Sequence, residues 1–180
     1  VNQSELIQII KERSSNSKRF LTIAIDGPSG SGKSSLAKYI SSEISGTSIV
    51  HMDDLYRGWL LTIGPNLTRE LLSIVEQLRA TGSAFYSKYD WHENLVLPPS
   101  ELKVENLLIL EGVGSAQAAL EDRIDLRIWL EVPVEIGLQR AIARDGQQIA
   151  PFMESFLEEQ DAYFTTEQTK ERSDFHLMGN

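Results

Sequence analysis

The sequence predicts a three-layer α/β/α domain built on a parallel sheet of roughly five strands. Apolar runs with the length of buried strands alternate with helical patterns, an order typical of a parallel sheet covered by helices on both faces. A glycine-rich motif follows the first of these runs, and acidic residues end three of them. Together these features indicate the P-loop NTPase class of α/β folds.

The predicted elements follow one another without a repeat or an evident interdomain linker. Apolar residues at helical spacing predict helices at residues 6–10, 33–44, 67–80, 133–146 and 151–164. Compact apolar runs predict strands at residues 20–25, 48–52, 107–110, 125–130 and 174–178. Pro133 is placed to begin a helix that Gly146 ends, and Gly82 is placed to end the helix predicted at 67–80. Residues 83–99 are expected to be an irregular, aromatic stretch.

Length and composition restrict the function classes. The 180 residues suit one domain, 1–180. A formal net charge of −9 argues against broad binding of nucleic acids or anionic membranes. The absence of cysteine excludes disulfides and thiolate metal sites and fits a reducing cytosol. Because no apolar run could span a membrane and residues 1–19 lack a signal-peptide pattern, we expect a cytoplasmic protein with a small-molecule partner.

Residues 27–34 read G-P-S-G-S-G-K-S and match G-x-x-x-x-G-K-[S/T] at every fixed position. Glycines let consecutive backbone N–H groups turn toward phosphate oxygens, and the helix that begins at Lys33 adds its positive dipole end. Lys33 is expected to reach the β- and γ-phosphates and Ser34 to ligate Mg²⁺. A chance glycine turn is disfavoured, because the motif lies between a buried strand and an amphipathic helix. The predicted ATP-binding residues of this motif are Gly27, Pro28, Ser29, Gly30, Ser31, Gly32, Lys33, Ser34 and Ser35.

Carboxylates follow three of the predicted strands, at Asp26, at the pair Asp53–Asp54 and at Glu111. The carboxyl ends of parallel strands share one edge of a sheet, so these acids should surround the nucleotide phosphates. One acid would hold Mg²⁺ together with Ser34, and another could accept a proton from an attacking hydroxyl. The alternative is that acids simply end strands. Placement favours function for Asp53 and Glu111, whereas Asp26 is interpreted as a turn-former and the role of Asp54 stays open.

Several further segments, in this order, resemble the uridine kinase and phosphoribulokinase group of P-loop kinases. The strand, P-loop and helix at residues 21–44 are similar to those of the group. The segments that follow are Met-Asp-Asp-Leu-Tyr at 52–56, Tyr-Asp-Trp-His at 89–92, Leu-Ile-Leu-Glu-Gly at 108–112, Arg-Ala-Ile-Ala-Arg-Asp at 140–145 and Ser-Asp-Phe-His-Leu at 173–177. The resemblance runs from about residue 21 to the C-terminus.

The resemblance implies roles for particular residues. It makes Asp53 the catalytic base and Glu111 the acidic residue of the Mg²⁺ shell, so that the implied metal site is Ser34, Asp53 and Glu111. It adds Arg140 and Arg144 as ATP contacts in a lid region at about 140–166, and the catalytic set becomes Asp53, Lys33 and Arg144. Residues 56–99, inserted between the strands that carry the two acids, should bind the acceptor. The implied acceptor-binding residues are Asp53, Tyr56, Tyr89, Asp90, Trp91, His92 and Gln160.

Three functions stay open at this level. The first is ATP- and Mg²⁺-dependent phosphoryl transfer to a hydroxyl of a nucleoside-like metabolite. The second is a nucleoside monophosphate kinase or another metabolite kinase, for pantothenate, nicotinamide riboside or a sugar. The third is a P-loop nucleotide-binding protein without catalysis, since no Lys or Arg lies between Arg144 and Lys170. An Asn-Lys-x-Asp guanine motif is absent, which disfavours a GTPase. Homo-oligomerisation is left open.

The basic residues of the inserted segment bear on the choice of acceptor. Only Arg57, Arg69, Arg79 and Lys88 could bind an acceptor phosphate there. The segment is otherwise rich in aromatic residues, which favours a neutral, ring-bearing acceptor. His51 alternates with its strand neighbours and is interpreted as structural, and Trp59 is a candidate to cover the acceptor.

Overall fold

A computed structural model describes residues 2–60 and 62–179. Both ends of the predicted domain, Val1 and Asn180, lie outside the described residues, as does Leu61 of the predicted insertion. The α-helices are α1 (Gln3–Asn16), α2 (Lys33–Glu43), α3 (Pro65–Thr81), α4 (Val134–Asp145) and α5 (Ala150–Glu167). Short 3₁₀ helices are η1 (Met52–Asp54), η2 (Ala118–Arg123) and η3 (Gln147–Ile149).

The central sheet has five parallel strands in the order β2-β7-β1-β8-β9. Their bounds are β1 (Leu21–Asp26), β2 (Thr47–His51), β7 (Leu107–Glu111), β8 (Leu126–Glu131) and β9 (Phe175–Met178). The predicted parallel α/β sheet is therefore confirmed, with each strand within a few residues of its predicted position.

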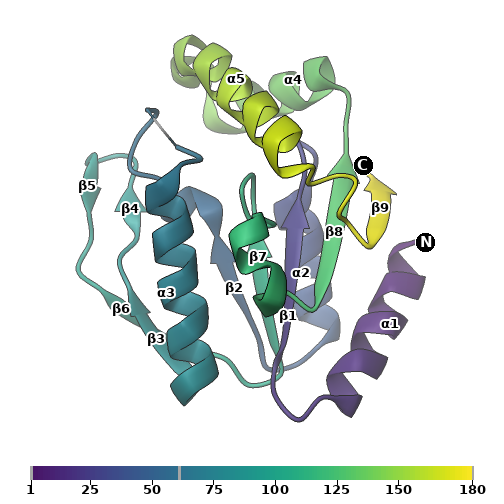
Figure 1. Ribbon diagram of the computed structural model, residues 1–180. Coiled ribbons are helices and arrows are strands. Elements are labelled where there is room, and N and C mark those ends of the chain that lie inside the picture. The colour runs from purple at the N-terminus through teal and green to yellow at the C-terminus, as the bar shows by residue number, and fades with distance from the viewer. Residues whose placement is uncertain (1, 61, 180) are drawn as a thin grey trace.

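Helices cover both faces of this sheet (Figure 1). Alternate residues of a strand point to opposite faces, so Leu107 and Ile109 of β7 belong to one core while Leu108 and Leu110 belong to the other. The first core includes the buried faces of α1 and α2, and the second includes those of α3 and α5. The result is the predicted three-layer α/β/α architecture, with burial of both sheet faces as its main source of stability.

Local signals account for several helix ends. Asn2 and Glu5 form a reciprocal capping box at the start of α1, with two hydrogen bonds of 2.9 Å. Pro65 occupies the first turn of α3, and Gly82 ends that helix in the left-handed conformation at φ 77°. These caps are the features that sequence patterns locate well, because they depend on neighbouring residues only.

The stretch expected to be irregular contains three short strands, β3 (Ser83–Tyr86), β4 (Tyr89–Asp90) and β5 (Leu95–Val96), so that prediction is wrong. β3 pairs with β6 (Ser100–Lys103), and β4 pairs with β5. In β3, Ala84 and Tyr86 are buried whereas Phe85 is 58% exposed, which is the alternation of a half-buried strand. Strands this short carry too few residues for a period of two to be recognised in the sequence. The β3–β6 pair lies beside α3 (Figure 1).

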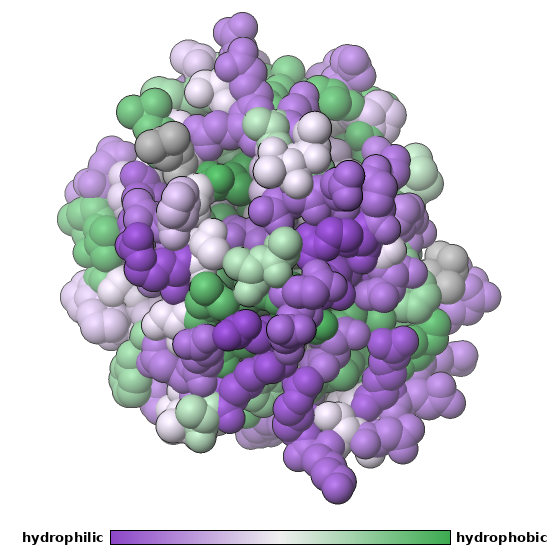
Figure 2. Space-filling model, viewed as in Figure 1, coloured by the Kyte–Doolittle hydropathy of each residue, from purple (hydrophilic) through white to green (hydrophobic). Residues whose placement is uncertain are grey.

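Hydrophilic residues predominate on the face shown in Figure 2, and hydrophobic residues form separate small areas on it. Among the exposed hydrophobic side chains are Leu95, Val96 and Leu97, around strand β5. Across the described residues, no helix combines the length and the apolar character needed to cross a bilayer.

Candidate active site

The P-loop connects β1 to α2 and is packed against helix α4. Gly30 has a φ of 72°, in the left-handed region that favours glycine. A Cβ at Gly30 would lie 2.1 Å from the carbonyl oxygen of Gly137, and a Cβ at Gly137 would lie 2.3 Å from the carbonyl oxygen of Ser29. Both glycines are therefore required for the close approach of α4 to the loop.

Lys33 is buried at the start of α2, with 7% of its surface exposed. Its ammonium group donates hydrogen bonds to the carbonyl oxygens of Gly27 at 2.8 Å and Pro28 at 2.7 Å. Burial lowers the pKa of Lys33, and the carboxylates of Asp26 and Glu111 oppose that shift. The predicted phosphate-binding lysine thus lies against the P-loop backbone at the carboxyl end of β1.

Glu111 ends strand β7 and contacts two polar side chains from neighbouring elements. The Ser34 hydroxyl donates a hydrogen bond to Oε1 of Glu111 at 3.0 Å, and Nδ1 of His51 contacts the same oxygen. Only 5% of the Glu111 side chain is exposed. Hydrogen bonding to Glu111 raises the pKa of His51. The structure therefore brings together two of the predicted metal ligands, Ser34 and Glu111.

The oxygen donors of Ser34 and Glu111 fit Mg²⁺, a hard cation that prefers oxygen ligands. Within residues 2–60 and 62–179, no group of three or more His, Cys, Asp or Glu side chains could hold a metal ion by itself. Mg²⁺ typically binds through one or two protein ligands and the phosphates of its nucleotide. The donor set therefore fits a nucleotide-borne Mg²⁺ better than a resident metal.

Asp53 lies in η1, directly after β2. Its side chain is solvent-exposed, yet protein surrounds it at longer range, and the resulting desolvation raises the pKa of Asp53. Repulsion from Glu111 acts in the same direction, whereas Arg144 and Lys33 act against it. The backbone carbonyl of Asp53 accepts a hydrogen bond of 2.9 Å from Nε1 of Trp91. Asp53 thus interacts electrostatically with charged groups near the P-loop, and its backbone carbonyl is bonded to an aromatic residue of the inserted segment.

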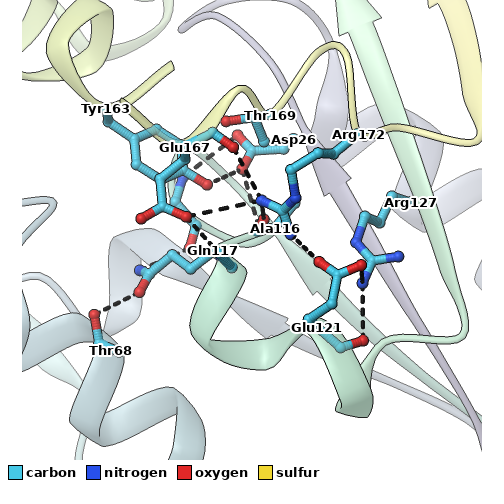
Figure 3. Close-up of polar contacts among 12 residues, drawn as sticks. Asp26, Thr68, Ala116, Gln117, Glu121, Arg127, Tyr163, Glu167, Thr169 and Arg172 are labelled. Carbon is cyan, nitrogen blue, oxygen red and sulfur yellow. Dashed lines mark hydrogen bonds and ion pairs between the residues drawn. The ribbon is translucent and has the colours of Figure 1, made fainter. Parts of the chain in front are cut away.

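Asp26, interpreted from the sequence as a turn-former, is fully buried and connects three segments (Figure 3). Its carboxylate accepts hydrogen bonds from the N–H groups of Gly27 at 2.8 Å, Gly114 at 3.3 Å and Ala116 at 3.0 Å. The Tyr163 hydroxyl donates a fourth hydrogen bond at 2.8 Å. Burial raises the pKa of Asp26, and these hydrogen bonds counteract the shift. Asp26 therefore does form the turn, and it also ties the P-loop to helix α5.

Arg140 and Arg144, the two arginines of the predicted lid region, have different surroundings. Arg144 is exposed and forms a two-pronged ion pair with Asp145, at 2.7 Å and 2.6 Å. That hydrogen bond raises the pKa of Arg144, and Asp53 contributes in the same direction. Nη1 of Arg140 is a buried atom with no hydrogen-bond partner among the described residues. A buried guanidinium nitrogen without an acceptor is unusual and is suited to receive an anionic ligand.

An aromatic cluster joins the inserted segment to helix α5. Trp59 stacks on Phe152 with ring centroids 5.3 Å apart and an interplanar angle of 8°. Trp91 lies 5.1 Å from Trp59 and 5.1 Å from Tyr89. Phe156 meets Trp59 edge-on at 6.2 Å. Phe152 and Phe156 of α5 therefore pack against Trp59, the candidate to cover the acceptor.

Other predicted acceptor residues have structural contacts of their own. Tyr56 is buried, and its hydroxyl donates to the carbonyl oxygen of Val113 at 2.6 Å. The Asp90 carboxylate accepts from the N–H groups of His92 at 2.9 Å and Glu93 at 3.0 Å, which defines a tight turn. The His92 side chain is exposed at this turn. Within the predicted stretch 89–92, Tyr89 and Trp91 therefore keep partly exposed rings near Asp53, while Asp90 shapes the backbone.

Gln160, predicted to contact the acceptor, is in contact with the P-loop. Its side chain is 1% exposed, and its Oε1 accepts a hydrogen bond of 2.8 Å from the N–H of Ser29. The preceding residue, Glu159, accepts hydrogen bonds from the N–H groups of Thr62 at 2.8 Å and Ile63 at 3.3 Å. Helix α5 thus contacts both the P-loop and the inserted segment. Sequence patterns gave no signal for Glu159, because an acidic residue on a helix usually faces solvent.

Comparisons with known proteins identify related kinases. The model of the cytidylate kinase family matches residues 23–66. A cytidylate kinase from Clostridioides difficile (strain 630) is 23% identical over 74% of this chain, and the match spans 59% of that protein. A uridine kinase from Psychromonas ingrahamii is 32% identical over 79% of this chain and 76% of its own length.

A solved structure shares the fold. The structure of a possible uridine kinase from Bacillus stearothermophilus aligns with a TM-score of 0.66 and 20% sequence identity, covering 96% of this chain and 99% of that one. At this identity the likeness concerns the fold alone. The uridine kinase from Psychromonas ingrahamii is similar to this chain in sequence as well, over most of both chains, as the resemblance in the motifs predicts. The chain belongs to the uridine kinase family of P-loop kinases.

Proposed function

We propose that this chain is an ATP-dependent kinase that transfers the γ-phosphoryl group to a hydroxyl of a nucleoside or a similar neutral, ring-bearing metabolite. The observation that carries the proposal is the position of Asp53. Its charge interacts with Lys33 and Glu111 on the nucleotide side, and its carbonyl group is hydrogen-bonded to Trp91 on the other side. A kinase of this class needs a carboxylate between a phosphate cradle and an acceptor site.

The nucleotide side would use backbone N–H groups of the P-loop and of the first turn of α2, with Lys33 against the terminal phosphates. Ser34 and Glu111 would hold the Mg²⁺ of ATP, which neutralises phosphate charge during transfer. Arg140 and Arg144, in the proposed lid region at about 140–166, would stabilise the charge of the transferring group. The buried, unpartnered Nη1 of Arg140 among the described residues supports such a contact.

Asp53 would accept the proton of the acceptor hydroxyl. Its raised pKa makes its carboxylate a stronger base than an ordinary aspartate, which favours proton acceptance near neutral pH. Tyr89 and Trp91 would contact the acceptor ring from the proposed acceptor segment at about 56–99, and Trp59 would cover it. The acceptor hydroxyl would then lie between Asp53 and the γ-phosphate.

The cations of the inserted segment support a neutral acceptor, because several already have partners. Arg57 pairs with Glu70 at 3.7 Å, and Lys88 pairs with Asp54 at 2.7 Å. Arg79 donates to backbone carbonyls of η2, away from Asp53. A phosphate on the acceptor would compete with these contacts for its charge-assisted hydrogen bonds.

A nucleoside monophosphate kinase is the second candidate, favoured by the cytidylate kinase family match. The match covers residues 23–66, which include the P-loop and Asp53 but end before most of the inserted segment. The matched residues therefore bear on the nucleotide side more than on the acceptor.

An acceptor screen tests the proposal. Purified protein is incubated with ATP and Mg²⁺ and with uridine, cytidine, UMP, CMP, pantothenate, nicotinamide riboside or a sugar, and ADP formation is measured. We expect stimulation by a nucleoside, abolished in Asp53→Asn. Stimulation by UMP or CMP alone would establish the monophosphate kinase instead, and nucleotide binding with no stimulation by any acceptor would favour a non-catalytic P-loop protein.

A further inference from the structure

We propose that His51 is a positioning residue that holds the Glu111 carboxylate in the orientation needed to receive the Mg²⁺ of the bound nucleotide. The inference rests on the proposed function, in which Glu111 becomes a metal ligand when nucleotide binds. His51 belongs to neither the predicted catalytic residues nor the predicted metal ligands, and its sequence pattern suggests only a strand residue.

The register of the sheet explains why the two side chains meet. Strands β2 and β7 are parallel neighbours, and His51 is paired directly with Glu111, as Val50 is with Leu110. Side chains alternate between the faces of a strand, so paired residues of adjacent strands project from the same face. The fold itself therefore places an imidazole beside this carboxylate at the carboxyl edge of the sheet.

Two contacts from different elements restrict the orientation of the Glu111 carboxylate. Nδ1 of His51 contacts Oε1 of Glu111, and the Ser34 hydroxyl reaches the same oxygen at 3.0 Å from helix α2. The Glu111 side chain is 5% exposed and that of His51 is 33% exposed. With its proton on Nδ1, the ring donates to the buried carboxylate and limits its rotation.

A second pair of charged residues also acts on His51. Asp54 and Lys88, paired at 2.7 Å, both interact electrostatically with the imidazole.

Hydrogen-bond partners of metal-ligating groups orient those ligands, and their loss typically costs about 10–100-fold in metal affinity. Ser34 would itself turn toward Mg²⁺ when the nucleotide binds. His51 would then be the contact that keeps Glu111 oriented throughout binding. Its removal should weaken the metal-dependent part of nucleotide affinity and leave the P-loop contacts intact.

Calorimetric titration with ADP, in Mg²⁺ and separately in EDTA, measures these two parts for wild type, His51→Leu and His51→Asn. We expect His51→Leu to lose about tenfold or more of the Mg²⁺-dependent gain in affinity, with unchanged affinity in EDTA. His51→Asn should keep most of the gain, because its amide nitrogen can occupy the position of Nδ1. His176→Leu is the matched control, because His176 lies on β9 at the opposite edge of the sheet.

A normal Mg²⁺-dependent gain in His51→Leu would overturn the inference. So would an equal loss of affinity in Mg²⁺ and EDTA, which indicates a general structural effect, or a His51→Asn variant as impaired as His51→Leu. If circular dichroism shows that His51→Leu does not fold, His51→Ala takes its place. Failure of the proposed function is distinguishable, because wild type itself would then bind no ADP or gain nothing from Mg²⁺.

Discussion

The side-chain oxygen of Gln160 accepts a hydrogen bond of 2.8 Å from the backbone N–H of Ser29, although the two residues are 131 positions apart. The contact makes helix α5 part of the P-loop structure, because Ser29 lies in the middle of the loop. The adjacent Glu159 binds the N–H groups of Thr62 and Ile63. Helix α5 is therefore the element through which the P-loop and the inserted segment are held together.

Gln160→Leu should lower the free energy of unfolding by about 1–3 kcal/mol, because it leaves a backbone donor without its acceptor in a buried position. Urea denaturation followed by circular dichroism measures this loss. Gln8→Leu, at an exposed position of α1, is the matched control and should change the stability little. Equal stability of the two variants would show that water replaces Gln160 at Ser29 without cost.

Lys33→Ala should abolish measurable ATP affinity and leave the fold intact, because Lys33 supplies charge to the phosphates and its hydrogen bonds are to backbone carbonyls of the loop. Calorimetric titration with ATP and Mg²⁺ checks the affinity, and circular dichroism checks the fold. Lys38→Ala removes an exposed lysine of the same helix and should bind ATP normally. Unchanged ATP binding by Lys33→Ala would contradict the P-loop assignment.

Asp53→Asn should reduce turnover by about 10²–10⁴-fold, the usual contribution of a general base, while ADP affinity changes much less. The measurement is steady-state ADP formation with the acceptor found by the screen, compared with calorimetric ADP binding. Asp54→Asn is the neighbouring control, because Asp54 is engaged by Lys88. If Asp54→Asn loses turnover and Asp53→Asn does not, the proton acceptor is Asp54.

Trp91→Ala should raise the KM for the acceptor and leave ATP affinity unchanged, since its ring lies in the aromatic cluster where we propose that the acceptor binds. Trp91→Phe keeps a ring and should lose less. Phe85→Ala removes an aromatic side chain that is 58% exposed in the same segment and should behave as wild type. An acceptor KM unaffected in Trp91→Ala would move the acceptor site away from this cluster.

The ion pairs of Glu121 should make the stability of the fold depend on pH in the acid range (Figure 3). Glu121 contacts Arg172 and pairs with Arg127 at 3.1 Å, and the Arg172 contact lowers the pKa of Glu121 below its ordinary value of 4.5. A carboxylate with a depressed pKa stabilises the fold above its unfolded-state pKa, and this contribution disappears as the pH falls through the folded-state value.

Wild type should therefore exceed Glu121→Gln in unfolding free energy at pH 7, and the difference should vanish in strong acid. We expect about 0.5–1 kcal/mol at most, because Glu121 is exposed and solvent screens the pairs. Urea denaturation between pH 7 and acid pH measures the difference. Glu12→Gln, at an exposed position of α1, serves as the control. A difference that is constant with pH would mean that packing, not charge, explains the effect.

The sequence by itself determined the architecture and the nucleotide side. Apolar runs, caps and the glycine-rich motif are local patterns, and chain physics converts them into strands, helix ends and a phosphate-binding turn. Asp53 and Glu111 could be placed on one edge because parallel strands share their carboxyl edge. The short pairs β3–β6 and β4–β5 could not be recognised, since each has too few residues to show a period.

The tertiary structure alone decided which side chains touch. His51 meets Glu111 because β2 and β7 are neighbours in one register, and Gln160 reaches Ser29 because α5 packs on the P-loop. Tyr56, predicted at the acceptor, is instead buried against Val113. These contacts join residues far apart in sequence, and local periodicity cannot predict which distant residues will meet. They depend on how the layers pack, which is settled only when the whole domain buries its two cores.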